Sequence, residues 1–333
     1  MSHWLENEWR RPTWRRFFLW PISALFGVLV RLRYALYRMG WLASEALPVP
    51  VVVIGNIHVG GSGKTPLTIH LANALSAKGW RPGIVSRGYG RESDEVCAVT
   101  VDSNVKAVGD EPLLMARSLQ SVPIWVGRDR VAAARALLAA HPKVNVLLCD
   151  DGLQHYRLAR SVSLCVMDGT REQTRCMLPA GPLREPWGRL KHIDAVVWNT
   201  HRNDQVLPSG VSSYLMTLVP GGFWQVSHPQ KEVTAAELKD KSLHAVAGIG
   251  HPARFEKTLK ELGLLVAVKP YPDHYAYQAK DFESVDADAV LMTEKDAVKC
   301  FSLNNDKLWA LRIQADVSPE LVAFVESRLK HGC

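Results

Sequence analysis

Short runs of apolar residues, separated by glycine-rich turns and amphipathic stretches, recur along most of the chain. From residue 49 onward these runs predict strands at 49–54, 82–86, 122–126, 144–151, 162–168 and 194–199. They are almost unbroken and rich in β-branched residues, which is typical of strands buried on both faces of a parallel sheet. Helical patterns at 111–119 and 129–140 fall between them. The alternation predicts an α/β fold whose mostly parallel sheet carries helices on both faces.

A second, smaller α/β unit is predicted near the C-terminus. Residues 200–240 are rich in proline and glycine, and we interpret them as a linker with irregular structure. Strands are then expected at 243–249, 264–268, 289–292 and 308–313, with helices at 252–262 and 319–329. The chain is thus expected to divide into an N-terminal segment (1–45), a core (46–220) and a linker with a C-terminal α/β domain (221–333).

The first 41 residues have a different pattern. Seven arginines and two glutamates give this segment a net charge of +5, out of +7 for the chain. Residues 17–30 are uncharged and mostly apolar, but they fall short of the about 20 residues that a spanning helix needs. Flanking arginines and the tryptophans at 4, 9, 14, 20 and 41 favour a helix in the interface of an anionic bilayer. The alternative is a helix packed into the core.

The composition is that of an ordinary folded protein, with 47% hydrophobic and 22% charged residues. Six cysteines show no C-x-x-C pair and no zinc-ligand spacing, which favours buried thiols in a reducing compartment. A disulfide scaffold and a zinc module are therefore excluded as classes, and the basic charge favours an anionic partner.

A glycine-rich loop joins the first predicted strand to a helical pattern that begins at Pro66. Residues 59–66 read Val-Gly-Gly-Ser-Gly-Lys-Thr-Pro, the arrangement of a P-loop, and the fold expected is therefore P-loop NTPase-like. Lys64 would reach the β- and γ-phosphates of a nucleotide, and the Thr65 hydroxyl would bind Mg²⁺. Backbone N–H groups of the loop would surround the phosphates, and these belong to Gly60, Gly61, Ser62 and Gly63. His58 occupies the slot where the usual pattern has its first glycine; a turn that binds nothing is the alternative.

Two adjacent carboxylates, Asp150 and Asp151, end the strand predicted at 144–151. A carboxylate at the tip of a strand in a P-loop protein is where Mg²⁺ is held. Successive residues of an extended chain point to opposite faces, so one aspartate could hold the metal while the other orients a loop. A helix cap or turn pair is the alternative.

Two further positions could move a proton. Asp110 opens a predicted helix, where capping is the default role, although an acid near phosphates could also accept the proton of an attacking hydroxyl. His274 follows a strand of the second unit and could share a proton with a carboxylate. From the residues alone, a surface histidine is the simpler interpretation.

Arginines recur in glycine- or proline-containing loops after predicted strands, at 87–91, 127–130 and 182–186. A guanidinium group is suited to binding phosphate or carboxylate through two parallel hydrogen bonds. We expect at least one of these loops to contact a phosphate.

Together, eight motifs resemble the tetraacyldisaccharide 4′-kinase family of lipid A biosynthesis, in order and over nearly the whole chain. The most specific is Asp-Asp-Gly-Leu-Gln-His at 150–155. The others are Val-Gly-Gly-Ser-Gly-Lys-Thr-Pro (59–66), Ser-Arg-Gly-Tyr-Gly (86–90), Gly-Asp-Glu-Pro (109–112), Gly-Arg-Asp-Arg (127–130), Leu-Pro-Ala-Gly-Pro-Leu-Arg-Glu-Pro (178–186), Pro-Asp-His-Tyr (272–275) and Thr-Glu-Lys-Asp-Ala-Val-Lys (293–299).

The resemblance implies ATP-dependent phosphorylation of the 4′-hydroxyl of a tetraacylated glucosamine disaccharide 1-phosphate, which gives lipid IV-A. It implies Asp110 as general base with His274 as its partner, Lys64 and Thr65 as nucleotide and Mg²⁺ ligands, and Asp150 and Asp151 on the metal side. Further active-site residues implied by the motifs are Tyr89, Arg130, Gln154, Arg184 and Glu185.

The same resemblance implies the location and the partners. The basic, apolar N-terminus is similar to the membrane anchor of that family, which implies the cytoplasmic face of the bacterial inner membrane. The expected partners are ATP, the acylated disaccharide and an anionic membrane surface, with no nucleic acid.

Two other classes of protein are alternatives to a kinase. A GTPase-type switch needs D-x-x-G and N/T-K-x-D, but Asp151 is followed directly by Gly152, and Lys295 is adjacent to Asp296. Guanine specificity is therefore unsupported. The second class is a nucleotide-gated membrane scaffold without turnover, which an assay of ATP-dependent phosphate transfer would distinguish from a kinase.

Overall fold

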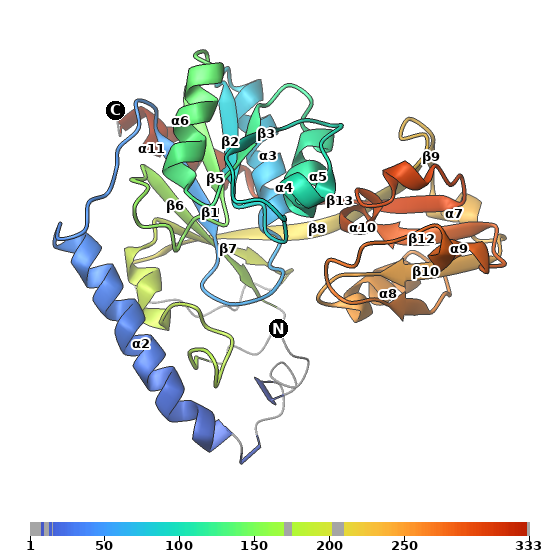
Figure 1. Cartoon of the computed structure of the whole chain (residues 1–333), viewed down its shortest axis with the longest axis horizontal. Helices are drawn as coiled ribbons and strands as arrows, with labels where there is room; N and C mark the ends of the chain where they lie inside the picture. Colours follow the sequence, from blue (N-terminus) through green and yellow to red (C-terminus); the bar gives the residue numbers. More distant parts are fainter. Residues whose placement is uncertain (1–7, 10–12, 15, 170–174, 202–209, 332–333) are drawn as a thin grey trace.

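Two α/β units share one continuous sheet in the computed structural model, which describes residues 8–9, 13–14, 16–169, 175–201 and 210–331 (Figure 1). The strand order is β11-β10-β12-β13-β8-β7-β6-β1-β5-β2-β4-β3, and β9 pairs with β8. The expected α/β class with a mostly parallel sheet is confirmed.

The core unit contains strands β1 to β7. Its strands run parallel except β3, which pairs antiparallel with β4. The strands are β1 (Val51–Gly55), β2 (Pro82–Ser86), β3 (Cys97–Val99), β4 (Ile124–Val126), β5 (Val146–Asp150), β6 (Val162–Asp168) and β7 (Ala195–Asn199). The helices are α3 (Lys64–Ala77), α4 (Val105–Val108), α5 (Asp110–Ser118), α6 (Arg130–Ala140) and the 3₁₀ helix η1 (Trp187–His192).

Strand β1 contributes to a hydrophobic core on each face of the sheet. Val52 and Ile54 pack into the core that contains α3 and α5, whereas Val51 and Val53 pack into the core that contains α6. Alternate residues of a strand point to opposite faces, so an unbroken apolar run is what a doubly covered strand requires. This is why the sequence pattern located the central strands well.

The C-terminal unit extends the same sheet beyond β8. Its parallel strands are β10 (Leu243–Ala247), β11 (Val268–Pro270), β12 (Ala289–Thr293) and β13 (Leu308–Val317), while β9 (Glu232–Val233) is antiparallel to β8. The helices are α7 (Ala235–Leu238), α8 (Pro252–Glu261), α9 (Lys280–Glu283), α10 (Glu294–Ala297) and the 3₁₀ helix η2 (Phe301–Leu303).

Strand β8 (Ser212–Gln225) corrects the interpretation of 200–240 as linker and irregular structure. It is parallel to β7 and antiparallel to β13, so it belongs to both units. The Pro-Gly-Gly run that suggested a linker lies at the point where the β8–β13 register shifts, with Pro220 opposite Ile313. Proline and glycine in a strand commonly mark such a bulge, and here they bend a strand rather than end it.

The strand expected at 264–268 is also wrong, because the ladder of β11 begins only at Val268. Leu264 and Val266 are buried in the core of the C-terminal unit without strand pairing. Helix α11 (Pro319–His331) closes the chain, and it packs against α3 of the core unit. The division at residue 220 stays a prediction, and β8 runs through that position.

Helix α2 (Arg16–Arg38) is longer than the apolar run that predicted it. Within the described part of the chain, it is the one helix long and apolar enough to cross a membrane by length and composition. Ser23 and Gly27 are buried against the core unit. The opposite face exposes Phe17, Phe18, Ile22, Leu25, Val28, Leu29 and Leu32. The arginines at 10, 11 and 15 and the tryptophan at 4 lie outside the described residues.

Candidate functional site

The glycine-rich loop after β1 is held by hydrogen bonds from two asparagines. Asn56 Nδ2 donates to the Gly60 carbonyl oxygen (3.2 Å) and to Ser62 Oγ (3.3 Å), and Asn199 Nδ2 donates to the Ser62 carbonyl oxygen (3.1 Å). Gly63 has a φ of 96°, and a Cβ there would lie 2.9 Å from Met216 Cε. A residue with a Cβ would be strained at this positive φ, and the hydrogen bonds from the two asparagines hold the loop in its shape.

Lys64 is the first residue of α3, and its Nζ lies 3.4 Å from Asp151 Oδ1. Arg184 Nη1 lies 3.6 Å from the other oxygen of the same carboxylate. Burial opposes ionisation of Asp151, but the charges of Lys64, Arg184 and Arg130 hold the pKa of this carboxyl below its usual value. Two cations therefore converge on one carboxylate at the P-loop, where a phosphate could replace it as their partner.

Asp150 is fully buried at the end of β5, where it accepts hydrogen bonds from Thr68 Oγ1 (3.3 Å) and Ser86 Oγ (3.4 Å). Burial, reinforced by the negative charge of Glu111, raises the pKa of this carboxyl. A divalent cation beside Asp150 would relieve that penalty. Thr65 lies in the first turn of α3, the helix whose Thr68 hydroxyl bonds to Asp150. These residues fit Mg²⁺, an ion that usually takes few protein ligands and keeps water and phosphate oxygens as the others.

The acidic residue that opens α5 faces the C-terminal unit. His274 Nδ1 lies 2.8 Å from Asp110 Oδ2, although the two residues are 164 positions apart in the chain. Gly109 is the N-cap of α5, but Asp110 Oδ1 accepts a hydrogen bond from the Glu111 N–H (3.0 Å), so Asp110 also satisfies a backbone donor in the first turn of the helix. The Tyr89 ring stands 5.1 Å from the imidazole of His274, and His274 itself has a φ of 62°. The histidine is thus held in a tightly specified position rather than left on the open surface.

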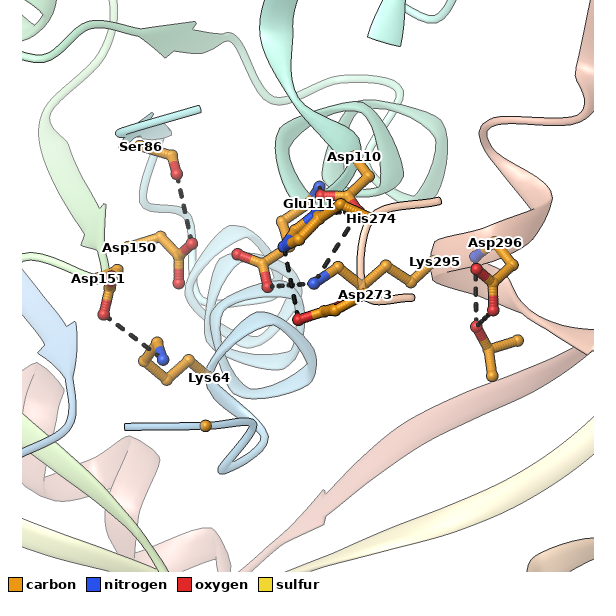
Figure 2. A network of polar contacts seen from close by, with 12 residues as sticks. Lys64, Ser86, Asp110, Glu111, Asp150, Asp151, Asp273, His274, Lys295 and Asp296 are labelled. Carbon is orange, nitrogen blue, oxygen red and sulfur yellow. Dashed lines mark hydrogen bonds and ion pairs between the residues drawn. The ribbon is translucent and has the colours of Figure 1, made fainter. Parts of the chain in front are cut away.

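Lys295 completes this cluster. It belongs to the motif at 293–299, from which no site role for this lysine was predicted. Its Nζ lies 3.9 Å from Asp110 Oδ2 and 3.2 Å from Glu111 Oε1 (Figure 2). Burial would raise the pKa of Asp110, but the His274 hydrogen bond and the Lys295 charge hold it below the ordinary value of 3.8. The available signal was positional, because Thr293 is the N-cap of α10, which begins at Glu294, and this places Lys295 in the first turn of the helix.

The remaining candidate residues divide between two places. Gln154 Nε2 donates to the Asn56 carbonyl oxygen (2.8 Å), and Arg130 Nη2 donates to the Asp151 carbonyl oxygen (3.3 Å), so both support the P-loop site. Glu185 does not contact that site. Its buried carboxylate accepts from Tyr156 (2.6 Å) and pairs with Arg189 (3.2 Å), under α2.

The chain matches the family model described as tetraacyldisaccharide-1-P 4′-kinase over residues 15–330. A tetraacyldisaccharide 4′-kinase from Dechloromonas aromatica (strain RCB) is 48% identical over 99% of this chain and 98% of the relative. One from Methylobacillus flagellatus is 45% identical over 98% and 96%. The crystal structure of LpxK from Aquifex aeolicus in complex with ATP matches with a TM-score of 0.82 and 31% identity, covering 94% of this chain and 99% of that one.

Replacing Asp110 with Asn should remove a pH-dependent part of the stability. Because the pKa of Asp110 is lowered on folding, its contribution is fully present above the unfolded value near 3.8 and is lost as the pH falls through the folded value. The free energy of unfolding of the wild type should exceed that of D110N by about 1–3 kcal/mol near neutral pH. This difference should shrink as the pH falls. Denaturant unfolding at several pH values measures it. The control is Asp286→Asn, at an exposed position; equal acid slopes for all three proteins would contradict the ionised Asp110.

Proposed function

The chain belongs to the tetraacyldisaccharide-1-P 4′-kinase family, and we propose that it transfers the γ-phosphoryl group of ATP to the 4′-hydroxyl of a tetraacylated glucosamine disaccharide 1-phosphate, forming lipid IV-A. The observation that carries this proposal is the Asp110–His274 contact of 2.8 Å, in a protein whose P-loop presents Lys64. The core unit thus carries both a site for the phosphate donor, at Lys64, and a candidate base for the acceptor hydroxyl, Asp110.

The P-loop would bind and orient the phosphates of ATP. Backbone N–H groups of residues 60–65 and the N-terminus of α3 face the phosphates, while Lys64 and Arg184 exchange their partner Asp151 for phosphoryl oxygens. Charge spreads over these oxygens in the transition state, so the two cations stabilise it more than the ground state. When bound beside Thr65, Asp150 and Asp151, Mg²⁺ would supply further charge neutralisation.

Asp110 would orient the acceptor hydroxyl and accept its proton. Its lowered pKa keeps it ionised at neutral pH, and His274 and Lys295 fix the carboxylate by contacts from the C-terminal unit. Phosphoryl transfer has a loose transition state, in which the hydroxyl loses its proton late, so a weak but well-placed base is sufficient.

We also propose that the protein works at the cytoplasmic face of the inner membrane, bound there through α2. Each CH₂ group of an acyl chain costs about 0.8 kcal/mol to move into water, so a four-chain acceptor stays in the bilayer and the enzyme must reach it there. The exposed apolar face of α2 and its flanking arginines support this placement.

Lys64→Ala should abolish transfer of phosphate from ATP to the disaccharide acceptor. The substitution removes a cation from the transferring phosphoryl group and leaves α3 otherwise intact. The test is the transfer of labelled γ-phosphate to purified lipid acceptor in mixed micelles, with exposed Lys257→Ala as the control. Turnover of K64A near the wild-type rate would refute the P-loop assignment, and no transfer by the wild type would favour a scaffold without turnover.

Asp110→Ala should lower kcat by roughly 10²–10⁴ with a smaller effect on the KM for ATP, because the base contacts the acceptor. If Asp110 and His274 act as a unit, the double variant should lose little more than the worse single variant. Steady-state kinetics of Asp110→Ala, His274→Ala and the pair measure this. Additive losses in log kcat would exclude a shared role.

Removal of residues 1–41 should shift the protein from the membrane to the soluble fraction and keep ATP binding. Burial of the apolar face is not screened by salt, so high salt should weaken vesicle binding of the full chain only in part. Sedimentation with anionic vesicles at low and high salt measures both effects. Identical sedimentation of the truncated and full chains would contradict anchoring through α2.

A further inference from the structure

A cavity of about 250 Å³ lies between α2 and η1, outside the P-loop site. Its lining residues are Val30, Arg31, Tyr34, Tyr156, Pro186, Gly188, Arg189 and His192. Helix η1 ends at His192, three residues before β7 begins, so this end of the cavity lies towards the amino end of β7. The other end of the cavity lies nearer the P-loop site, because Pro186 and Tyr156 each lie two residues after a residue that contacts that site, Arg184 and Gln154.

The walls of the cavity are rigid and aromatic. The buried Arg189 guanidinium lies 4.5 Å from the centre of the Tyr34 ring, and Tyr34 packs on Tyr156 at 5.4 Å. Arg189 Nη1 also donates to the His192 carbonyl oxygen (2.7 Å), which fixes the end of η1. The site therefore needs little ordering before it binds a ligand.

The cavity carries an excess of positive charge. No acidic residue is among its lining residues in the described chain. The charge of Arg189 is balanced by the nearby Glu185, so the excess comes from Arg31 and from Arg38 and Lys191 close to His192. Burial, together with the charges of Arg38, Arg189 and Lys191, lowers the pKa of His192. Arg31 is exposed at the cavity and adds a further cation. Such a field attracts an anion.

We propose that this cavity binds the phosphate-bearing headgroup of an anionic glycerophospholipid. The anion would be a membrane component because Arg31 and Tyr34 belong to α2, within two turns of the exposed apolar residues Val28 and Leu29. The cavity is below the roughly 300–1,000 Å³ typical of sites for whole small molecules, so it suits a headgroup better than a nucleotide or a disaccharide. The aromatic walls suit the glycerol carbons, and the exposed Arg31 suits the phosphodiester.

This site rests on the proposed membrane association of α2, but it is separate from catalysis. Its effect would be to hold α2 in one position on the core unit when the protein is at an anionic surface. A lipid headgroup that contacts both elements stabilises their packed arrangement by binding it preferentially.

The test uses Gly188, which lines the cavity and has no atom within 4 Å of a Cβ placed on it. Gly188→Asp adds a negative charge to the cavity, whereas the isosteric Gly188→Asn adds the same bulk without charge. Binding of short-chain phosphatidylglycerol, below its micelle-forming concentration, is measured by calorimetry on the full chain in neutral detergent, without ATP or disaccharide. Gly188→Asp should bind phosphatidylglycerol at least about tenfold more weakly than Gly188→Asn.

A second pair of variants each removes one arginine, so both change the net charge of the protein by the same amount. Arg31→Gln should weaken the same binding by about tenfold, whereas Arg135→Gln, at an exposed position on α6, should change it by less than about twofold. Equal effects within either pair would overturn the proposal, since diffuse charge would then explain the binding.

Two ligand arms identify the source of the anion. Inorganic phosphate that binds as tightly as phosphatidylglycerol would overturn the assignment to a lipid headgroup, and so would short-chain phosphatidylcholine that binds equally well. Headgroup binding without vesicle binding would refute anchoring through α2 but support this site. Vesicle binding without an effect of the Gly188 substitutions on headgroup binding would refute this site but support anchoring through α2.

Discussion

The pairing of β8 with strands on both of its sides is the constraint on which the rest of the structure depends. One edge of β8 bonds to β7 of the core unit and the other to β13 of the C-terminal unit. Backbone hydrogen bonds along 14 residues fix the two units in one sheet more firmly than a flexible linker could. His274 and Lys295 can therefore meet Asp110 at hydrogen-bonding and ion-pair distances from a separate part of the chain.

The charges at the site are arranged so that each buried carboxylate has a different partner. Asp151 takes Lys64 and Arg184, Asp110 takes His274 and Lys295, and Asp150 has only hydroxyl donors among its hydrogen-bond partners in the described residues. An ionised carboxylate without a cation is costly in a buried place. This asymmetry is the reason for proposing Asp150 as a metal ligand and Asp110 as the base.

Most of the central sheet could be predicted because buried parallel strands leave a strong pattern. Residues 82–86 and 162–168 coincide with β2 and β6. Strand β8 could not be predicted because it is half exposed and bent, and its Pro-Gly-Gly run has the composition of a turn. The Asp110–His274 contact followed from the family resemblance; composition and spacing left both residues with ordinary roles. Glu185 was assigned to the site by its motif, but burial under α2 is a tertiary effect that no local pattern encodes.

Helix α11 has a consequence for how the chain assembles. The C-terminal unit occupies the sequence between β8 and α11, yet Leu321, Val325 and Leu329 of α11 are buried in the same core as Leu67 and Leu71 of α3. In topological terms the C-terminal unit is an insertion within the core unit. During synthesis the core unit is therefore incomplete until α11 leaves the ribosome, whereas the apolar α2 emerges before that unit. A chain that ends before α11 would expose the hydrophobic surface of α3, the helix that begins at Lys64 of the P-loop. Incomplete synthesis would therefore destabilise the P-loop.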